Sequence, residues 1–329
     1  MQEFVGNVKL NLDYYSGEDL YSDGDIENEI LDIVKNYKPE EYNSVINSRA
    51  NWPVLYHLSP IRTNCVEWID IEKTDSVLEI GAGCGAITGA LAKKANSVTC
   101  VELSKRRSTI NATRNKEFDN IEIFVGNFQT VEKDLGQFDV ITLIGVLEYA
   151  QYYISSKKPY EEFLKIVLKH LKPNGKLILA IENKLGMKYW AGCKEDHNGG
   201  YFESIENYPN NKGVRTFSRG ELEKMFIDTG YSNHEFYYPY PDYKLPMAIY
   251  SDKFLPSLGD LRNNMRNFDG DRVILFDEGK AFDNIIENGL FPEFSNSFLI
   301  QFLIRSGLTM TRSSFSNSIK LKPPNVAAY

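Results

Sequence analysis

The sequence lacks long apolar runs, paired cysteines and an excess of positive charge. None of its segments approaches the run of about 18 apolar residues that a membrane-spanning helix needs. The N-terminal residues show neither the basic start nor the apolar centre of a secretion signal. We therefore expect a soluble, cytoplasmic protein without a membrane span. The four cysteines form no C-x-x-C pair, which argues against a zinc site of that kind and favours reduced thiols.

Acidic residues outnumber basic residues by 45 to 37, which gives a formal net charge of −8. Proteins that contact nucleic-acid phosphates need a basic surface, so this balance argues against a nucleic-acid partner. Hydrophobic residues make up 42% of the chain and charged residues 25%. These values are close to globular averages and exclude disordered, collagen-like and coiled-coil proteins.

From residue 76 onward, short apolar segments alternate with amphipathic helical segments. The five strands expected from this pattern are 76–80, 97–103, 121–126, 138–146 and 176–183. Apolar strands that are joined by helices predict an α/β fold with a doubly wound, mostly parallel sheet. Two later strands, 234–240 and 296–304, are expected to pair antiparallel, so that the last strand is antiparallel.

The expected organisation is a core domain with additions at both ends and two cap insertions. The parts are an accessory segment (1–45), the core domain (46–306), its insertions (187–217 and 241–295) and a loosely ordered tail after Gly307 (307–329). The accessory segment carries one amphipathic helix, which Asp25 is expected to cap. From Trp52 we expect an extended stretch and then a helix that ends near Trp68.

The strongest chemical signal is a glycine turn between a strand and a helix, in the segment Val77-Leu78-Glu79-Ile80-Gly81-Ala82-Gly83-Cys84-Gly85. Three glycines allow the backbone to turn tightly and to approach a ligand at the carboxyl end of a parallel strand. In a dinucleotide-binding loop the third glycine comes one residue later. Glu79 would repel phosphate there, but it can accept a hydrogen bond from the ammonium group of an amino acid.

A second acid, Glu102, ends the next strand about twenty residues downstream, where a carboxylate can bind both ribose hydroxyls. Together the two acids describe a ligand that joins an amino acid to a nucleoside. Residues 75–182 resemble the class I methyltransferases that use S-adenosylmethionine, with a Rossmann-like fold. The resemblance implies that Glu79, Gly81, Gly83 and Gly85 hold the methionine part of the cofactor. It also implies that Glu102 binds the ribose and that Leu103 covers one face of the adenine.

The same resemblance implies further cofactor contacts. Asn127 stands where the family has an aspartate, and its carbonyl can accept from the adenine amino group beside Phe128. Gly145 lies in a strand-end motif that lines the cofactor in the family, and Tyr149 stands where many relatives carry histidine. We expect Arg62 to grip the cofactor carboxylate with two hydrogen bonds, the alternative being a pair with a surface acid.

Four further segments resemble the methyltransferases found beside glycosyltransferases in bacterial surface-polysaccharide pathways. They are 56–62, 181–186, 216–222 and 291–296, and the likeness extends from about residue 13 to Ser297. It implies methyl transfer to an oxygen, a hydroxyl or acid group of a sugar or glycan intermediate, with glycosyltransferases as candidate partners. A small-molecule N- or O-methyltransferase of a natural-product pathway is the first alternative. An inactive cofactor-binding scaffold and a nicotinamide dehydrogenase are the others.

Two residues are candidates for the general base. His197 lies in the first insertion, and an ordinary histidine pKa of about 6.5 suits a base at neutral pH. Glu182 ends the fifth expected strand, on the rim that faces the ligand. A solvated loop histidine and a structural cap are the respective alternatives. The end of the fourth strand shows no carboxylate cluster of the catechol type, so we expect no metal.

Overall fold

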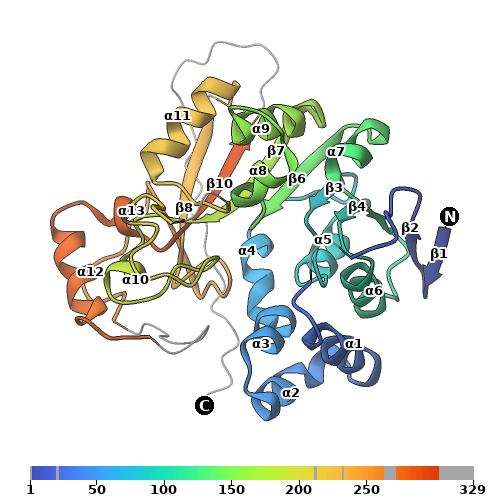
Figure 1. The fold of residues 1–329 in the computed structure, drawn as a ribbon, viewed down its shortest axis with the longest axis horizontal. Helices are drawn as coiled ribbons and strands as arrows, with labels where there is room; N and C mark the ends of the chain where they lie inside the picture. The colour runs from blue at the N-terminus through green and yellow to red at the C-terminus, as the bar shows by residue number, and fades with distance from the viewer. Residues whose placement is uncertain (1, 20–21, 211–212, 232, 263–271, 304–329) are drawn as a thin grey trace.

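A computed structural model describes residues 2–19, 22–210, 213–231, 233–262 and 272–303. The predicted tail lies outside these residues. The described chain forms one sheet with helices on both faces (Figure 1), in the strand order β1-β2-β5-β4-β3-β6-β7-β10-β8-β9. The strands are β1 Gln2–Val5, β2 Val8–Asn11, β3 Ser76–Ile80, β4 Ser97–Glu102, β5 Ile121–Val125, β6 Phe138–Ile144, β7 Leu171–Glu182, β8 His234–Tyr240, β9 Ala248–Ser251 and β10 Ser297–Leu303.

The centre of the sheet is parallel, from β2 through β5, β4, β3 and β6 to β7. Strand β10 runs antiparallel to both β7 and β8. The helices that connect or follow the strands are α5 Thr88–Lys94, α6 Lys105–Arg114, α7 Phe128–Val131, α8 Ala150–Tyr153, α9 Pro159–Lys169 and α11 Arg219–Thr229. The predicted Rossmann-like sheet and its antiparallel last strand are therefore confirmed.

The hydrophobic core has one layer on each face of the sheet. Leu78 and Ile80 of β3 pack into the layer that contains the α9 and α11 side chains, whereas Val77 packs into the layer with α5. Successive residues of a strand point to opposite faces, so a strand covered on both sides is apolar along most of its length. This arrangement explains why the central strands could be recognised as short apolar runs.

Residues 2–11, which fall in the predicted accessory segment, belong to the sheet. Strands β1 and β2 form a hairpin, and β2 continues the sheet in parallel beside β5. Each strand has only four residues, too few for alternation to distinguish a strand from a loop. The predicted amphipathic helix is present as α1, Ile26–Asn36, but the Asp25 side chain makes no capping hydrogen bond.

The stretch that begins at Trp52 is helical, so the predicted extended conformation is wrong. Helix α3, Trp52–Leu58, begins after Asn51, whose Oδ1 accepts a hydrogen bond from the Val54 N–H at 3.0 Å. Pro53 does not disturb it, because the first turn of a helix leaves its N–H groups unpaired in any case. A 3-10 turn at Pro60–Thr63 and helix α4, Asn64–Glu67, follow. Figure 1 shows α3 beside α1 and α2, Tyr42–Arg49, in a small helical layer.

The two predicted insertions carry short elements of their own. Residues 187–217 include α10, Met187–Trp190, and residues 241–295 include β9, α12, Glu278–Glu287, and α13, Phe291–Phe294. Figure 1 places α10, α12 and α13 together at one side of the molecule. No helix in the described part of the chain has the length and apolar character to cross a bilayer.

Candidate functional site

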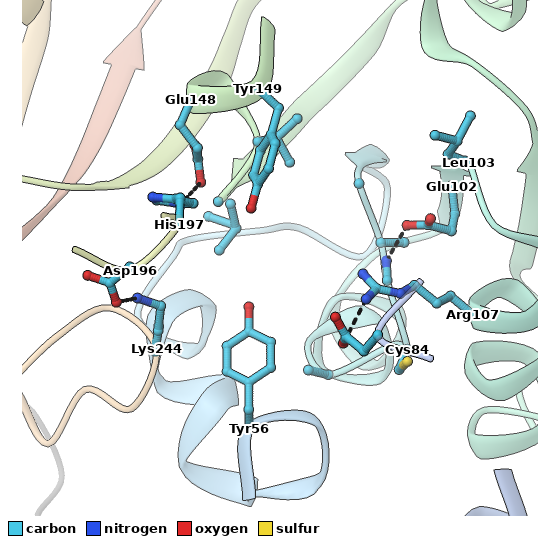
Figure 2. A pocket seen from close by; sticks show the side chains of 18 of the residues that line it. Tyr56, Cys84, Glu102, Leu103, Arg107, Glu148, Tyr149, Asp196, His197 and Lys244 are labelled. Carbon is cyan, nitrogen blue, oxygen red and sulfur yellow. Dashed lines mark hydrogen bonds and ion pairs between the residues drawn. The ribbon is translucent and has the colours of Figure 1, made fainter. Parts of the chain in front are cut away.

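A pocket of about 670 Å³ lies at the carboxyl ends of the parallel strands β3 to β7. This is the edge at which open α/β sheets bind ligands, and the volume is within the range of about 300–1,000 Å³ usual for such sites. Figure 2 shows Glu102 and Arg107 on one side of the pocket and Glu148 and His197 on the other. We refer to these sides as the Glu102 end and the His197 end.

The glycine turn after β3 adopts backbone conformations that favour glycine. Gly81, Gly83 and Gly85 have φ values of +75°, +52° and +76°. Gly81 and Gly83 line the pocket, as predicted, but Gly85 does not. A Cβ atom on Gly85 would overlap Asn111 of α6. Gly85 therefore allows the turn to pack closely on α6 and has no contact with the pocket.

Glu102 lines the pocket at the end of β4, where it was predicted. The Gly83 N–H donates to its Oε2 at 2.7 Å and the Ser104 N–H donates to its Oε1 at 3.0 Å. Burial raises the pKa of this carboxyl, and the backbone donors act in the opposite direction. An ionised carboxylate has about four acceptor positions, so both oxygens can still accept from a ligand. Leu103 also lines the pocket.

Glu79 does not line the pocket, although it was predicted to contact the ligand. Its Oε2 accepts from the Thr88 hydroxyl at 2.7 Å and from the Cys100 thiol at 3.4 Å. Strand alternation turns residue 79 to the same face as Val77, which is covered by α5. Burial raises the pKa of Glu79 to about 7. The Glu79 carboxyl thus binds Thr88, the first residue of α5, which follows the glycine turn.

Asn127, Phe128 and Gly145 line the pocket as predicted. The Asn127 Oδ1 accepts from the Gln129 N–H at 3.0 Å and so caps α7, which leaves it one further acceptor position. Gly145 has a φ of +69°, and a Cβ atom there would lie 2.7 Å from the Tyr243 hydroxyl. Glycine at this position therefore allows Tyr243 to approach the end of β6.

Arg62 is buried and lines the pocket. Its guanidinium lies over the Tyr56 ring at 4.2 Å and donates to the Lys244 carbonyl at 3.0 Å. No surface acid pairs with it among the described residues, and its Nε has no hydrogen-bond partner there. A guanidinium has five N–H donors, so Arg62 retains donors for a ligand carboxylate.

The N-terminal segment closes the Glu102 end, which the sequence did not indicate. Asp23, Ile26 and His57 all line the pocket. Arg107 of α6 pairs with Asp23 and with Glu27 of α1, each at 2.7 Å. Burial lowers the pKa of His57, although Asp23 lies 3.2 Å away. No local motif signals this contact, because it joins charges about eighty residues apart.

Glu148, Glu182 and His197 meet at the other end of the pocket. Glu182 is the last residue of β7, Glu148 lies in the 3-10 turn Leu147–Tyr149 after β6, and His197 follows α10. One ligand-forming atom from each of the three lies within 4.8 Å of the others. Glu148 and Glu182 are 1% and 0% exposed. The Oε2 atom of each has no hydrogen-bond partner in the described structure.

His197 is held between two carboxylates. Its Nδ1 lies 2.9 Å from Glu195 Oε1, and its Nε2 lies 3.8 Å from Glu148 Oε1. Burial lowers the pKa of His197, but Glu148, Glu195 and Glu182 outweigh this effect and raise it well above the usual histidine value. The predicted ordinary histidine pKa is therefore wrong, because residues distant in the sequence surround the ring with negative charge.

Two buried lysines complete the His197 end. The Lys244 Nζ contacts Glu182 Oε1 and lies 2.6 Å from Asp196 Oδ1. The Lys188 Nζ lies 2.9 Å from Asp196 and 2.8 Å from Asp242. Burial raises the pKa of Glu182, but the charges of Lys244 and His197 outweigh it and lower the pKa below its usual value. Glu148 and this lysine network were not predicted from the sequence, although Glu148 lies in the strand-end motif beside Tyr149.

Comparison with known proteins identifies the central part of the chain. Residues 78–177 match a family described as a methyltransferase domain. A ribosomal RNA small subunit methyltransferase A of Streptococcus mutans is 33% identical over 118 residues, which cover 32% of this chain and 40% of that protein. A ubiquinone biosynthesis O-methyltransferase of Coxiella burnetii is 29% identical over 141 residues, which cover 42% of this chain and 56% of that protein. The chain thus spans about half the length of these relatives.

A solved structure of phosphoethanolamine N-methyltransferase 1 from Haemonchus contortus, bound to phosphoethanolamine and S-adenosylhomocysteine, aligns with a TM-score of 0.47. It is 13% identical, over 89% of this chain and 53% of that one. A methyltransferase solved with the Haloferax volcanii activator Trm112 aligns with a TM-score of 0.46 and 14% identity, over 83% of this chain and 100% of that one. From the family match and the sheet described above, the chain carries a class I, Rossmann-like methyltransferase domain whose cofactor is S-adenosylmethionine.

Proposed function

We propose that this protein transfers the methyl group of S-adenosylmethionine to a hydroxyl oxygen of a sugar or glycan intermediate. One observation carries the proposal. A single pocket joins the Glu102 end, which suits the cofactor, to the His197 end, where two buried carboxylate oxygens lack hydrogen donors. An acceptor with several hydroxyl groups would supply those donors.

The residues at the Glu102 end fit the cofactor. Gly81 and Gly83 leave the backbone open to a ligand, and Glu102 keeps acceptor positions for two ribose hydroxyls. Arg62 retains guanidinium donors for the amino-acid carboxylate. When bound, the cofactor supplies a methyl group that is activated by a sulfonium. The neighbouring residues have only to bind and orient it and to exclude water.

The His197 end favours a hydroxyl acceptor over an acid. Ionised carboxylates accept hydrogen bonds but cannot donate them, so the Oε2 atoms of Glu148 and Glu182 require a donor. An acceptor carboxylate would bring further negative charge against them. Figure 2 shows the hydroxyl groups of Tyr56 and Tyr149 directed into the space between the two ends. Aromatic side chains with a polar tip commonly line the pockets of small ligands.

In the proposed reaction the acceptor oxygen attacks the methyl carbon in line with the bond that breaks. The new C–O bond forms as the C–S bond breaks, and the hydroxyl proton passes to a carboxylate at the His197 end. The protein has to hold the two reacting atoms about 3–3.5 Å apart. A hydroxyl of another small molecule is the second candidate acceptor, because the Coxiella burnetii relative is named as an O-methyltransferase. Glycosyltransferase partners remain a prediction.

The test is an assay with methyl-labelled cofactor and separate panels of sugar nucleotides, phenols and amines. We expect the label on a sugar nucleotide, in an ether that is stable to alkali. Labelling of amines alone, or an alkali-labile ester, would contradict the proposal. The variant Glu182→Gln should lower kcat by about 10²–10⁴-fold. The matched control is Glu221→Gln, since Glu221 also pairs with a lysine, Lys184 at 2.9 Å, but does not line the pocket.

A further inference from the structure

The three side chains that meet at the His197 end have the composition of a metal site. We propose that Glu148, Glu182 and His197 bind one divalent cation of the first transition row, such as Mn²⁺. Imidazole nitrogen suits zinc and iron, whereas carboxylate oxygen suits manganese and magnesium, and ions of this row accept both. Neither the family match nor the relatives assign a metal to these residues.

The spacing of the three groups suits a common ion. Metal–ligand bonds of about 2.0–2.2 Å place two ligands of one ion no more than about 4.4 Å apart. The His197 Nε2 and Glu148 Oε1 atoms are 3.8 Å apart, which is long for a hydrogen bond but suitable for two ligands. The outermost pair lies within 4.8 Å. To bind one ion, the two atoms of this pair must approach each other by less than about half an ångström.

The orientation of His197 is fixed by a neighbour in the manner usual for metal-binding histidines. Its Nδ1 pairs with Glu195 Oε1 at 2.9 Å, so that the Nε2 atom faces Glu148. Metal-binding histidines typically use one nitrogen in this way to hold the other toward the ion. Glu195 is itself fixed, because its Oε2 accepts from the backbone N–H groups of His197 and Asn198, each at 2.8 Å.

Unpaired carboxylate oxygens point independently to a bound cation. The Oε2 atoms of Glu148 and Glu182 are buried without a hydrogen-bond partner in the described structure. A buried charged group left without a partner is costly. Lys244 contacts the Oε1 atom of Glu182 and is shared with Asp196, so it leaves the second oxygen of Glu182 available.

The charge around this position also favours a cation. Five carboxylates, Glu148, Glu182, Glu195, Asp196 and Asp242, face the two ammonium groups of Lys188 and Lys244 and the imidazole of His197. Negative charge is therefore in excess, and a divalent ion that displaces the His197 proton would reduce this excess. Three protein ligands also leave coordination positions open, as in catalytic metal sites. An acceptor hydroxyl can fill one of them, which deepens the proposed function, yet the ion can be measured without an acceptor.

The test is a titration of the full-length protein with Mn²⁺, followed by the electron paramagnetic resonance signal of the free ion. We expect one Mn²⁺ per chain and at least a tenfold loss of affinity in Glu148→Gln and in His197→Gln. The matched control is Glu132→Gln, because Glu132 also pairs with a buried histidine, His170 at 3.2 Å, outside the pocket. Its Mn²⁺ affinity should equal that of the wild type. Calorimetry with S-adenosylhomocysteine establishes that each variant is folded.

The proposal is overturned if the folded wild type binds no Mn²⁺ at millimolar concentration and no Zn²⁺ in a separate calorimetric titration. It is equally overturned if Glu148→Gln and Glu132→Gln bind Mn²⁺ alike. Either result would remove the metal site and leave methyl transfer to be judged by the labelling assay. Labelling that fails while one Mn²⁺ still binds at Glu148 and His197 would instead reject the proposed function alone.

Discussion

At the scale of single residues, Glu79 and Glu102 show what decides the role of an acid near a strand end. Both were expected to touch the cofactor, but only Glu102 lines the pocket. Glu102 is the last residue of β4 and lies beside the glycine turn. Glu79 comes before the end of β3 and faces α5, and it accepts hydrogen bonds from Thr88 of α5 and from Cys100 of β4. In the register of the two strands Glu79 lies opposite Cys100, two positions before Glu102. This offset leaves Glu102 at the pocket and Glu79 buried.

Replacing Glu102 tests its contact with the ribose. For Glu102→Ala we expect a loss of cofactor binding free energy of about 1–3 kcal/mol, because hydrogen bonds to a charged acceptor disappear. Calorimetry with S-adenosylhomocysteine measures it. The control is Glu122→Ala on β5, where the carboxylate pairs with Lys9 at 2.8 Å and does not line the pocket. Equal affinities in the two variants would remove Glu102 from the cofactor site.

Glu79 should make the stability of the cofactor-free protein depend on pH. Burial raises the pKa of Glu79 to about 7 from the usual 4.5 of a glutamate. The folded state therefore binds more protons than the unfolded state between these two values, and stability falls as the pH rises through this window. Glu79→Gln keeps an acceptor for Thr88 but cannot ionise. When the pH is raised from 5 to 8, the free energy of unfolding of Glu79→Gln should increase by about 1–3 kcal/mol relative to that of the wild type.

Urea unfolding at these two pH values measures the effect. A free-energy difference between variant and wild type that is the same at both would show that Glu79 keeps an ordinary pKa in the folded protein. Glu122→Gln is a suitable reference, because the Glu122 side chain is 32% exposed and pairs with Lys9 at the surface.

Most of the residues predicted to bind the cofactor line the pocket, because they follow successive strands of one sheet. Gly81, Glu102, Asn127 and Gly145 each come directly at or after a strand end, and the parallel arrangement brings those ends to one edge. The His197 end could not be predicted in the same way. It brings together a turn, a strand end and a loop, and the charges that shift the pKa of His197 are set by tertiary packing.

At the scale of elements, a buried ion pair between Glu27 and Arg107 holds the N-terminal helix α1 against α6. Glu27 is fully buried and accepts from Arg107 at 2.7 Å, from the Ser22 hydroxyl at 2.8 Å and from the Asp23 N–H at 2.9 Å. Ile30 and Ile33 add apolar contacts to α2 and α3. Since Asp23 and Ile26 line the pocket, the docking of α1 determines how the Glu102 end is closed.

Weakening the ion pair between Glu27 and Arg107 should lower both the stability of the protein and its affinity for the cofactor. Glu27→Gln removes the charge that Arg107 faces, and we expect the free energy of unfolding to fall by about 1–3 kcal/mol. Amide exchange within α1 should become faster, and S-adenosylhomocysteine should bind more weakly. Glu29→Gln is the control on the same helix, because Glu29 pairs with Arg49 at the surface. If α1 exchanges at the same rate in both variants, the buried pair does not hold the helix.

Elements were predicted where a strand was long and apolar, and they were missed where it was short. The first four central strands and the β8–β10 pair follow the expected ranges closely, whereas β7 begins at Leu171, five residues before the expected start. Strands β1, β2 and β9 have four residues each, and only their partners in the sheet define them. The start of α3 was misjudged because its capping by Asn51 is a contact over three residues, which periodicity does not register.

At the scale of the whole molecule, one pocket links two chemically different ends. The Glu102 end offers backbone groups, acceptors and an arginine, whereas the His197 end offers buried carboxylates and a histidine. The domain at residues 78–177 supplies the glycine turn and Glu102 to the first end and Glu148 to the second. Segments outside it supply Arg62 to the first end and Glu182, His197 and Lys244 to the second. The matched domain therefore does not include three of the side chains at the His197 end.

The most direct measurement is a calorimetric titration of the protein with S-adenosylhomocysteine and, separately, with NAD. The account predicts one S-adenosylhomocysteine per chain with an affinity of micromolar order, about −8 kcal/mol, and no heat with NAD. The Glu102→Ala variant should bind more weakly under the same conditions. Binding of NAD without binding of S-adenosylhomocysteine would contradict the assignment of the pocket to a methyl donor.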